Sequence, residues 1–313
     1  MAPWIRGPGG RVTLLETAES ASIAAPRDVS LAAPAVDDVA RRLSAIYHGL
    51  EARADLRPGA HVDALFHQLV HLVLSTPDEL AVRAFDDVRV SSLAPRLREL
   101  CATGETELEL AWARRIGGSD DPSLTLSQFP YLSNYRLLAR MEAGAVARAV
   151  DHPVRSLAFV GSGPLPMSAF LLARELGAAV DGIDRDPVAV TTARRLARAL
   201  GLSHLRIVHE GAGRVDLSGY DVVVLAALVG ATGEEKAGVL AHLARSMAPG
   251  ATLLIRSARG MRMLLYPEVE RTLLDEFDVR TVIHPDGEVI NSVIVAQIPR
   301  RGAVPVPRPG SEA

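Results

Sequence analysis

A glycine turn and an aspartate stand at the spacing of a nucleotide-binding site. Gly161-Ser162-Gly163 directly follows Leu157–Val160, a short apolar run that predicts a buried parallel strand. Glycines let the backbone approach a ligand closely, and free N–H groups at a helix start favour an anionic group. Asp184 ends the next predicted strand, 184 − 161 = 23 residues after Gly161, close to the roughly 20 expected for a carboxylate that binds ribose hydroxyls. The alternative is that Asp184 caps a helix beginning near Pro187.

The glycine turn favours S-adenosylmethionine (SAM) over a dinucleotide. Pro166 stands where the dinucleotide motif has its last glycine, and Pro164 and Pro166 suit a first helical turn. The segment 209–213 is expected to run beside the adenine and to contact it through backbone groups, because we identify no acidic residue there. The predicted SAM contacts are Gly161, Ser162, Gly163, Pro164, Asp184, Arg185, Gly211, Ala212, Ala226, Ala227 and Leu228.

In the first half of the chain, the patterns of polar residues indicate a functional site less strongly than the glycine turn does. Glu105 and Glu109 are four residues apart and share a helix face. Two tyrosines and an asparagine stand close together in Phe129–Tyr135. Taken alone, the glutamates are interpreted as a solvated face and the tyrosines as packing residues. Three histidines lack carboxylate partners at metal-ligand spacing and are interpreted as packing residues, with no metal expected; they are His61, His67 and His71.

The elements predict two domains. Helical periodicity covers about 36–50, 61–74, 94–116 and 134–150, which indicates an all-helical domain at 35–150 after a flexible arm at 1–34. The second half alternates strands with helices, then ends in two strands, 279–283 and 289–297, with no room for a helix between them. An antiparallel end of this kind is typical of SAM-dependent methyltransferases. We therefore predict an α/β Rossmann-like SAM-dependent methyltransferase fold at 151–299, preceded by the helical domain and followed by a disordered tail at 300–313.

Composition narrows the class of protein. The chain has 313 residues, 48% of them hydrophobic, and a net charge of −3, so no charge excess predicts nucleic acid or an anionic membrane as a partner. One cysteine and no signal-like N-terminus favour a cytoplasmic protein. No apolar run approaches the roughly 18 residues of a membrane span. The expected partners are small molecules, with a homodimer left open.

Five blocks of the sequence resemble the nicotianamine synthases and their bacterial metallophore-forming relatives. They are Phe-Val-Gly-Ser-Gly-Pro-Leu-Pro at 159–166, Phe-Pro-Tyr-Leu-Ser-Asn-Tyr at 129–135, and the segments 221–230, 256–267 and 284–293. The resemblance runs from about residue 62 to about residue 296. It implies a helical lid over a SAM-binding domain, and transfer of the 3-amino-3-carboxypropyl group of SAM to an amine with release of 5′-methylthioadenosine.

The resemblance also implies roles for particular residues. Glu109 would bind and deprotonate the amine, and Tyr135 would orient the amine or the carboxylate of SAM, with Tyr131 and Glu105 as second choices. This reverses the interpretation of these residues as solvated or packing groups. Three further residues are candidates for binding the substrate, namely Arg256, Arg259 and Tyr266, and Arg262 is a further candidate for clamping a carboxylate.

The acceptor stays open because the segment 180–186 resembles bacterial methyltransferases more than the plant synthases. The acceptor could be another SAM, an amino acid, or the SAM's own amine, which would close to azetidine-2-carboxylate. Outside this chemistry the alternatives are methyl transfer on the same fold and a non-catalytic SAM-binding module.

Overall fold

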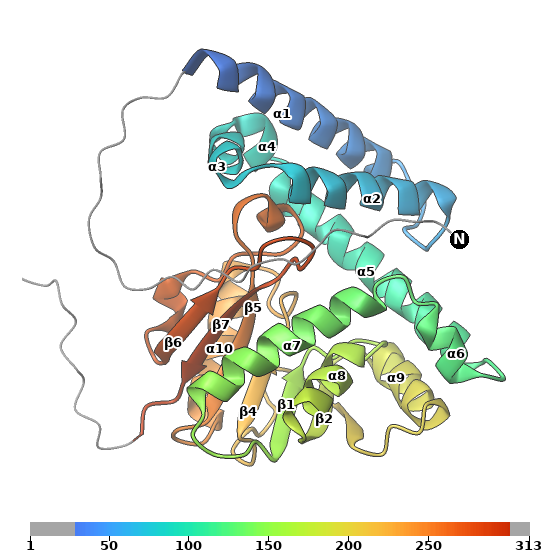
Figure 1. Ribbon diagram of the computed structural model, residues 1–313, viewed down its shortest axis with the longest axis vertical. Helices are drawn as coiled ribbons and strands as arrows, with labels where there is room; N and C mark the ends of the chain where they lie inside the picture. Colours follow the sequence, from blue (N-terminus) through green and yellow to red (C-terminus); the bar gives the residue numbers. More distant parts are fainter. Residues whose placement is uncertain (1–28, 301–313) are drawn as a thin grey trace, which may run out of the picture.

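The structure is a computed structural model that describes residues 29–300. The first half is helical, as predicted, and Figure 1 shows α1 to α4 stacked at one end of the molecule, beyond the strands. The helices are α1 (Val29–Glu51), α2 (Ala60–Ser75), α3 (Asp78–Asp86), α4 (Val88–Ser91), α5 (Ala94–Gly117), α6 (Pro122–Ser127) and α7 (Leu132–Ala149). Helix α1 begins within the predicted arm, so residues 29–34 are helical instead, while residues 1–28 and the tail from 301 lie outside the described residues.

The second half forms one mixed seven-stranded sheet in the order β3-β2-β1-β4-β5-β7-β6. The first five strands in chain order are parallel, and β7 runs antiparallel to both β5 and β6. The strands are β1 (Ser156–Val160), β2 (Ala179–Asp184), β3 (Leu205–His209), β4 (Val222–Leu225), β5 (Thr252–Ser257), β6 (Asp278–Ile283) and β7 (Ser292–Gln297). The predicted Rossmann-like methyltransferase topology, with its antiparallel end, is confirmed.

Helices cover both faces of the sheet. Alternate residues of each strand face opposite sides, so Leu157 and Phe159 pack with α7 and the helices that follow it, whereas Ala158 and Val160 pack toward α10. The remaining helices are α8 (Met167–Leu176), α9 (Pro187–Ala199) and α10 (Gly233–Ser246), with short 3₁₀ helices η1 (Gly260–Leu264) and η2 (Arg271–Leu274).

The hydrophobic cores do not divide at residue 150. Helix α7 packs in the core of the sheet, although the sequence places it in the helical domain. Conversely, Met261, Leu264 and Leu265 at and just after η1 pack in the core formed by α1 to α5. The boundary drawn from sequence followed the change from helices to strands, whereas the apolar faces of these segments bury against elements on the other side of that boundary.

Helix α5 connects the two cores. Its first turns bury Leu97 and Cys101 in the helical core, and its last turns bury Ala113 and Ile116 in the core of the sheet. Figure 1 shows α5 running from the stacked helices toward α9. The polar middle of α5 is thereby held above the sheet.

Candidate active site

A cavity of about 960 Å³ lies where the polypeptide leaves the carboxyl ends of β1, β2, β3 and β4. Strand order reverses between β1 and β4, and ligands of open α/β sheets bind at such a reversal. The middle of α5, the start of α7 and the segment after β5 close the cavity from the side of the helices. All eleven predicted SAM contacts line it: Gly161, Ser162, Gly163, Pro164, Asp184, Arg185, Gly211, Ala212, Ala226, Ala227 and Leu228.

The turn after β1 depends on two glycines in the left-handed region, Gly161 at φ 83° and Gly163 at φ 67°. L-residues with a Cβ are strained there. The backbone N–H of Gly163 donates to Asp184 Oδ2 at 2.8 Å, and the N–H of Asp186 donates to Asp184 Oδ1 at 3.0 Å. The cap of α9 is Asp186, which accepts from the N–H of Val188. The alternative interpretation of Asp184 as the helix cap is therefore wrong.

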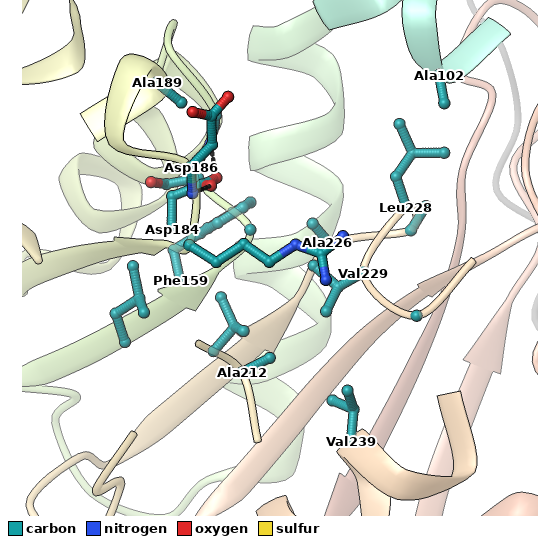
Figure 2. A pocket seen from close by; sticks show the side chains of 18 of the residues that line it. Ala102, Phe159, Asp184, Asp186, Ala189, Ala212, Ala226, Leu228, Val229 and Val239 are labelled. Atoms are coloured by element: carbon teal, nitrogen blue, oxygen red, sulfur yellow. Dashed lines mark hydrogen bonds between the residues drawn. The ribbon is translucent and has the colours of Figure 1, made fainter. Parts of the chain in front are cut away.

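The wall opposite Asp184 follows β4, whereas the end of β3 lies beside β2 on the side of Asp184. Figure 2 shows Asp184 and Asp186 on one side of the cavity and Leu228 and Val229 across from them. Glu210, directly after β3, also lines the cavity and accepts from the N–H of Gly211 at 2.8 Å. The expectation that segment 209–213 lacks an acidic residue is wrong, and sequence inspection at the strand end should have found this carboxylate.

Two glutamates of α5 face the cavity, and each accepts a hydrogen bond from a tyrosine of another segment. Tyr135 Oη of α7 donates to Glu109 Oε1 at 2.9 Å, and Tyr266 Oη, just after η1, donates to Glu105 Oε2 at 2.8 Å. All four side chains line the cavity. The interpretation of these glutamates, taken alone, as a solvated face is wrong.

Glu109 also touches the predicted SAM-binding turn. A Cβ added to Gly163 would lie 2.5 Å from Glu109 Oε2. Only a glycine leaves room for the carboxylate at this place. The helix that carries the candidate base therefore crosses directly over the turn between β1 and α8.

Burial makes both carboxylates weaker acids. Desolvation raises the pKa of Glu109 well above its usual range, and the neighbouring Glu105 raises it further. Desolvation also raises the pKa of Glu105, against the opposing hydrogen bond from Tyr266. A carboxylate with a raised pKa is a stronger base than one in water. The pair is suited to accept a proton or to bind an ammonium group.

Arg256 lines the cavity, but its guanidinium is engaged by protein groups. It donates from Nε to Glu142 Oε1 at 2.7 Å and from Nη2 to Glu142 Oε2 at 3.0 Å, and Nη1 contacts Ser168 Oγ at 3.2 Å. Glu142 is fully buried. The two-pronged clamp predicted for a substrate carboxylate is therefore occupied by Glu142, and Arg256 joins β5 to α7.

Three other candidates lie outside the cavity lining. Tyr131 precedes α7 and packs edge-on against Phe129 at 5.9 Å between ring centroids. Arg259 is exposed. Arg262 donates to the carbonyl oxygens of Gly287 and Val289 and so holds the connection between β6 and β7.

The histidines of α2 are also placed differently from the prediction. His61, His67 and His71 are exposed, so their interpretation as packing residues is wrong. Across residues 29–300, no group of three or more His, Cys, Asp or Glu side chains is placed to hold a metal ion. In the same range, no helix combines the length and the apolar character that a membrane crossing requires.

Asn291 lines the cavity although the sequence did not single it out as a candidate site residue. Asn291 precedes β7, is only 6% exposed, and its Nδ2 has no hydrogen-bond partner among the described residues. A buried donor without a partner is unusual. It had been noted only within the 284–293 block.

The sheet order, the glycine turn and the acidic strand end define a protein with the fold of the SAM-dependent methyltransferases. Residues 33–301 match the family described as "Nicotianamine synthase protein". This chain belongs to the nicotianamine synthase family.

Curated relatives agree over most of their length. Nicotianamine synthase 2 of Oryza sativa subsp. japonica is 41% identical over 290 residues, covering 86% of this chain and 88% of the relative. Nicotianamine synthase 9 of Hordeum vulgare is 43% identical over 251 residues, covering 77% of this chain and 73% of the relative. Nicotianamine synthase 2 of Arabidopsis thaliana is 35% identical over 266 residues, covering 83% of each.

Solved structures share the fold. A crystal structure of a mutant of MtNAS in complex with S-adenosylmethionine superposes with a TM-score of 0.73 at 24% identity, covering 83% of this chain and 98% of that one. MtNAS in complex with MTA and tNA gives 0.73 at 23% identity, covering 87% and 99%.

Proposed function

We propose that this chain is a nicotianamine synthase that transfers 3-amino-3-carboxypropyl groups from SAM to an amine. The observation that carries the proposal is the position of Glu109, whose carboxylate contacts the glycine turn expected to bind SAM and accepts a hydrogen bond from Tyr135. A base in this position can reach the amine of an acceptor that lies beside the amino-acid part of bound SAM. The names of the curated relatives support nicotianamine as the product.

The reaction follows from this placement. The neutral amine attacks the γ-carbon of SAM, a new C–N bond forms, and the C–S bond breaks with its electron pair left on sulfur, so that methylthioadenosine departs. Glu109 accepts the proton that the nitrogen loses, and burial favours this because it raises the pKa of the carboxyl. Tyr135 orients the carboxylate of Glu109 through the hydrogen bond that it donates. All three carbons on the sulfonium are electrophilic, so selectivity depends on which of them the cavity holds in line with the amine, at about 3–3.5 Å.

The experiment is mass spectrometry of the purified protein incubated with SAM alone and with added amino acids. Methylthioadenosine together with nicotianamine from SAM alone is the expected result. S-adenosylhomocysteine as the nucleoside product would instead establish methyl transfer and refute the proposal. Glu109→Gln keeps the shape of the side chain but removes the base, and it should stop methylthioadenosine release while SAM still binds. A non-catalytic binding module would show no turnover in either protein.

Several further properties belong to the same proposal. Amines and carboxylates, which this product combines, suit transition metals as ligands, and we propose that the product is a metallophore. A cytoplasmic location is consistent with a single cysteine. Helices α1 to α5 are proposed to act as a lid, and a homodimer stays a prediction that size-exclusion chromatography with light scattering tests.

A further inference from the structure

The cavity holds the same pair of groups twice, but the transfer step uses it once. Glu109 with Tyr135 and Glu105 with Tyr266 are both carboxylate–phenol pairs, with O–O distances of 2.9 and 2.8 Å. Both pairs line the same cavity, and their glutamates stand one helical turn apart on α5. The proposed chemistry explains the first pair and leaves the second without a role.

The spacing of the two glutamates matches the repeat of the product. Side chains at i and i+4 of a helix have Cβ atoms about 5–6 Å apart. Each transferred unit separates successive amine nitrogens by three carbons, which is about 5 Å when extended. An intermediate lying along α5 therefore presents one amine to Glu109 and the preceding amine to Glu105.

Charge also favours a cation at Glu105. Within residues 29–300 no ion pair engages Glu105, because the nearby guanidinium of Arg256 is held by Glu142. Burial raises the pKa of Glu105, and the hydrogen bond from Tyr266 and the charge of Arg256 oppose this only in part. A protonated amine would supply a counter-charge. Asn291, nearly buried in the same cavity wall, has an unpartnered amide nitrogen that is suited to the carboxylate accompanying each amine.

We infer that Glu105 and Tyr266 form a second ammonium-binding station, which holds the previous amine of the growing chain while the newest amine reacts at Glu109. The inference rests on the proposed transferase function. The station binds no amine of the acceptor in the first transfer, when the acceptor carries only the amine that reacts at Glu109. It acts in the second transfer, and Glu105 is therefore a positioning residue that determines how many units are added.

The test compares the products of four variants with those of the wild type, each incubated with SAM alone. Mass spectrometry measures methylthioadenosine and the products that carry one and two transferred units. The variants are Glu105→Gln, Glu105→Asp, Tyr266→Phe and, as the matched control on the same helix but outside the cavity lining, Glu107→Gln. Thermal unfolding and SAM affinity of each variant report on folding and on the donor site.

Glu105→Gln and Tyr266→Phe are expected to lower the ratio of two-transfer to one-transfer product about tenfold, the factor that one charge-assisted hydrogen bond supplies. Glu105→Asp should recover part of the ratio, and Glu107→Gln should match the wild type. An unchanged ratio in Glu105→Gln, or an equal loss of both products, would overturn the inference. If Glu105→Gln does not fold, the ratios of Tyr266→Phe and Glu105→Asp decide in the same way. A wild-type protein that releases no methylthioadenosine would instead refute the proposed function.

Discussion

Gly163→Ala separates the geometry of the site from the stability of the fold. Gly163 has φ 67°, and an added Cβ would lie 2.5 Å from Glu109 Oε2. Gly177, at the end of α8, has nearly the same φ of 68°, but a Cβ there meets nothing within 4 Å. Alanine in the left-handed region costs about 1–2 kcal/mol. Both variants should therefore lose about that much free energy of unfolding, measured by urea denaturation.

Only Gly163→Ala should lose activity. Ordinary contact of a Cβ begins at 3.4 Å, so the carboxylate must withdraw by 3.4 − 2.5 = 0.9 Å. A displacement of about 1 Å between reacting groups costs about 100-fold in rate. We expect kcat for methylthioadenosine release to fall about 100-fold in Gly163→Ala and to stay near the wild-type value in Gly177→Ala. Wild-type kcat in Gly163→Ala, or an equal fall in Gly177→Ala, would refute the argument that Glu109 reacts from this position.

Three further perturbations follow from the structure. Tyr135→Phe removes the hydrogen bond that lowers the pKa of Glu109, so the acid limb of the kcat/KM profile should move to higher pH; a limb that stays in place would exclude Glu109 as the titrating base. Glu142→Leu leaves the Arg256 guanidinium buried without its partner and should cost about 3–5 kcal/mol in denaturant unfolding, and the double replacement of both residues by leucine should recover most of that loss. Burial lowers the pKa of Lys236 from 10.5 to about 8. Between these two pH values the unfolded chain binds a proton that the folded chain has lost, so the free energy of unfolding should rise with pH. Lys236→Met should remove that rise, and a rise that persists in this variant would assign it to another group.

The sequence was sufficient for the elements with strong periodicity or punctuation. Strands β1, β4, β5 and β7 were recognisable because each is a short, mostly apolar run, and the turn after β1 because of its glycines. Helices α3, α4 and α6 were missed because they are short and show too few turns for a helical period. The start of α1 was placed after Pro34, because residues 1–34 are rich in Ala, Pro, Gly and Ser and lack clear periodicity, yet α1 begins at Val29.

The site was less accessible to sequence analysis because its decisive contacts are remote along the chain. Glu105 meets Tyr266 across 161 residues, and Arg256 meets Glu142 across 114. Residue type alone left Arg256 as a candidate for binding the substrate, and only the position of a buried carboxylate on α7 shows that its guanidinium is taken. Tyr131 and Tyr135 are both plausible by type and both pack edge-on against Phe129, but Tyr131 only caps the start of α7, whereas Tyr135 lies within the helix and lines the cavity.

The shared core has a consequence for the order in which the protein is made. Met261, Leu264 and Leu265 complete the core of α1 to α5, yet a ribosome synthesises them after most of the 313 residues. Until these residues are synthesised, helices α1 to α5 expose the apolar surface that they will cover. Exposed apolar surface makes a nascent chain prone to aggregation. The first half of this protein is therefore expected to need a chaperone during synthesis, and a fragment ending near residue 150 should be insoluble when expressed alone.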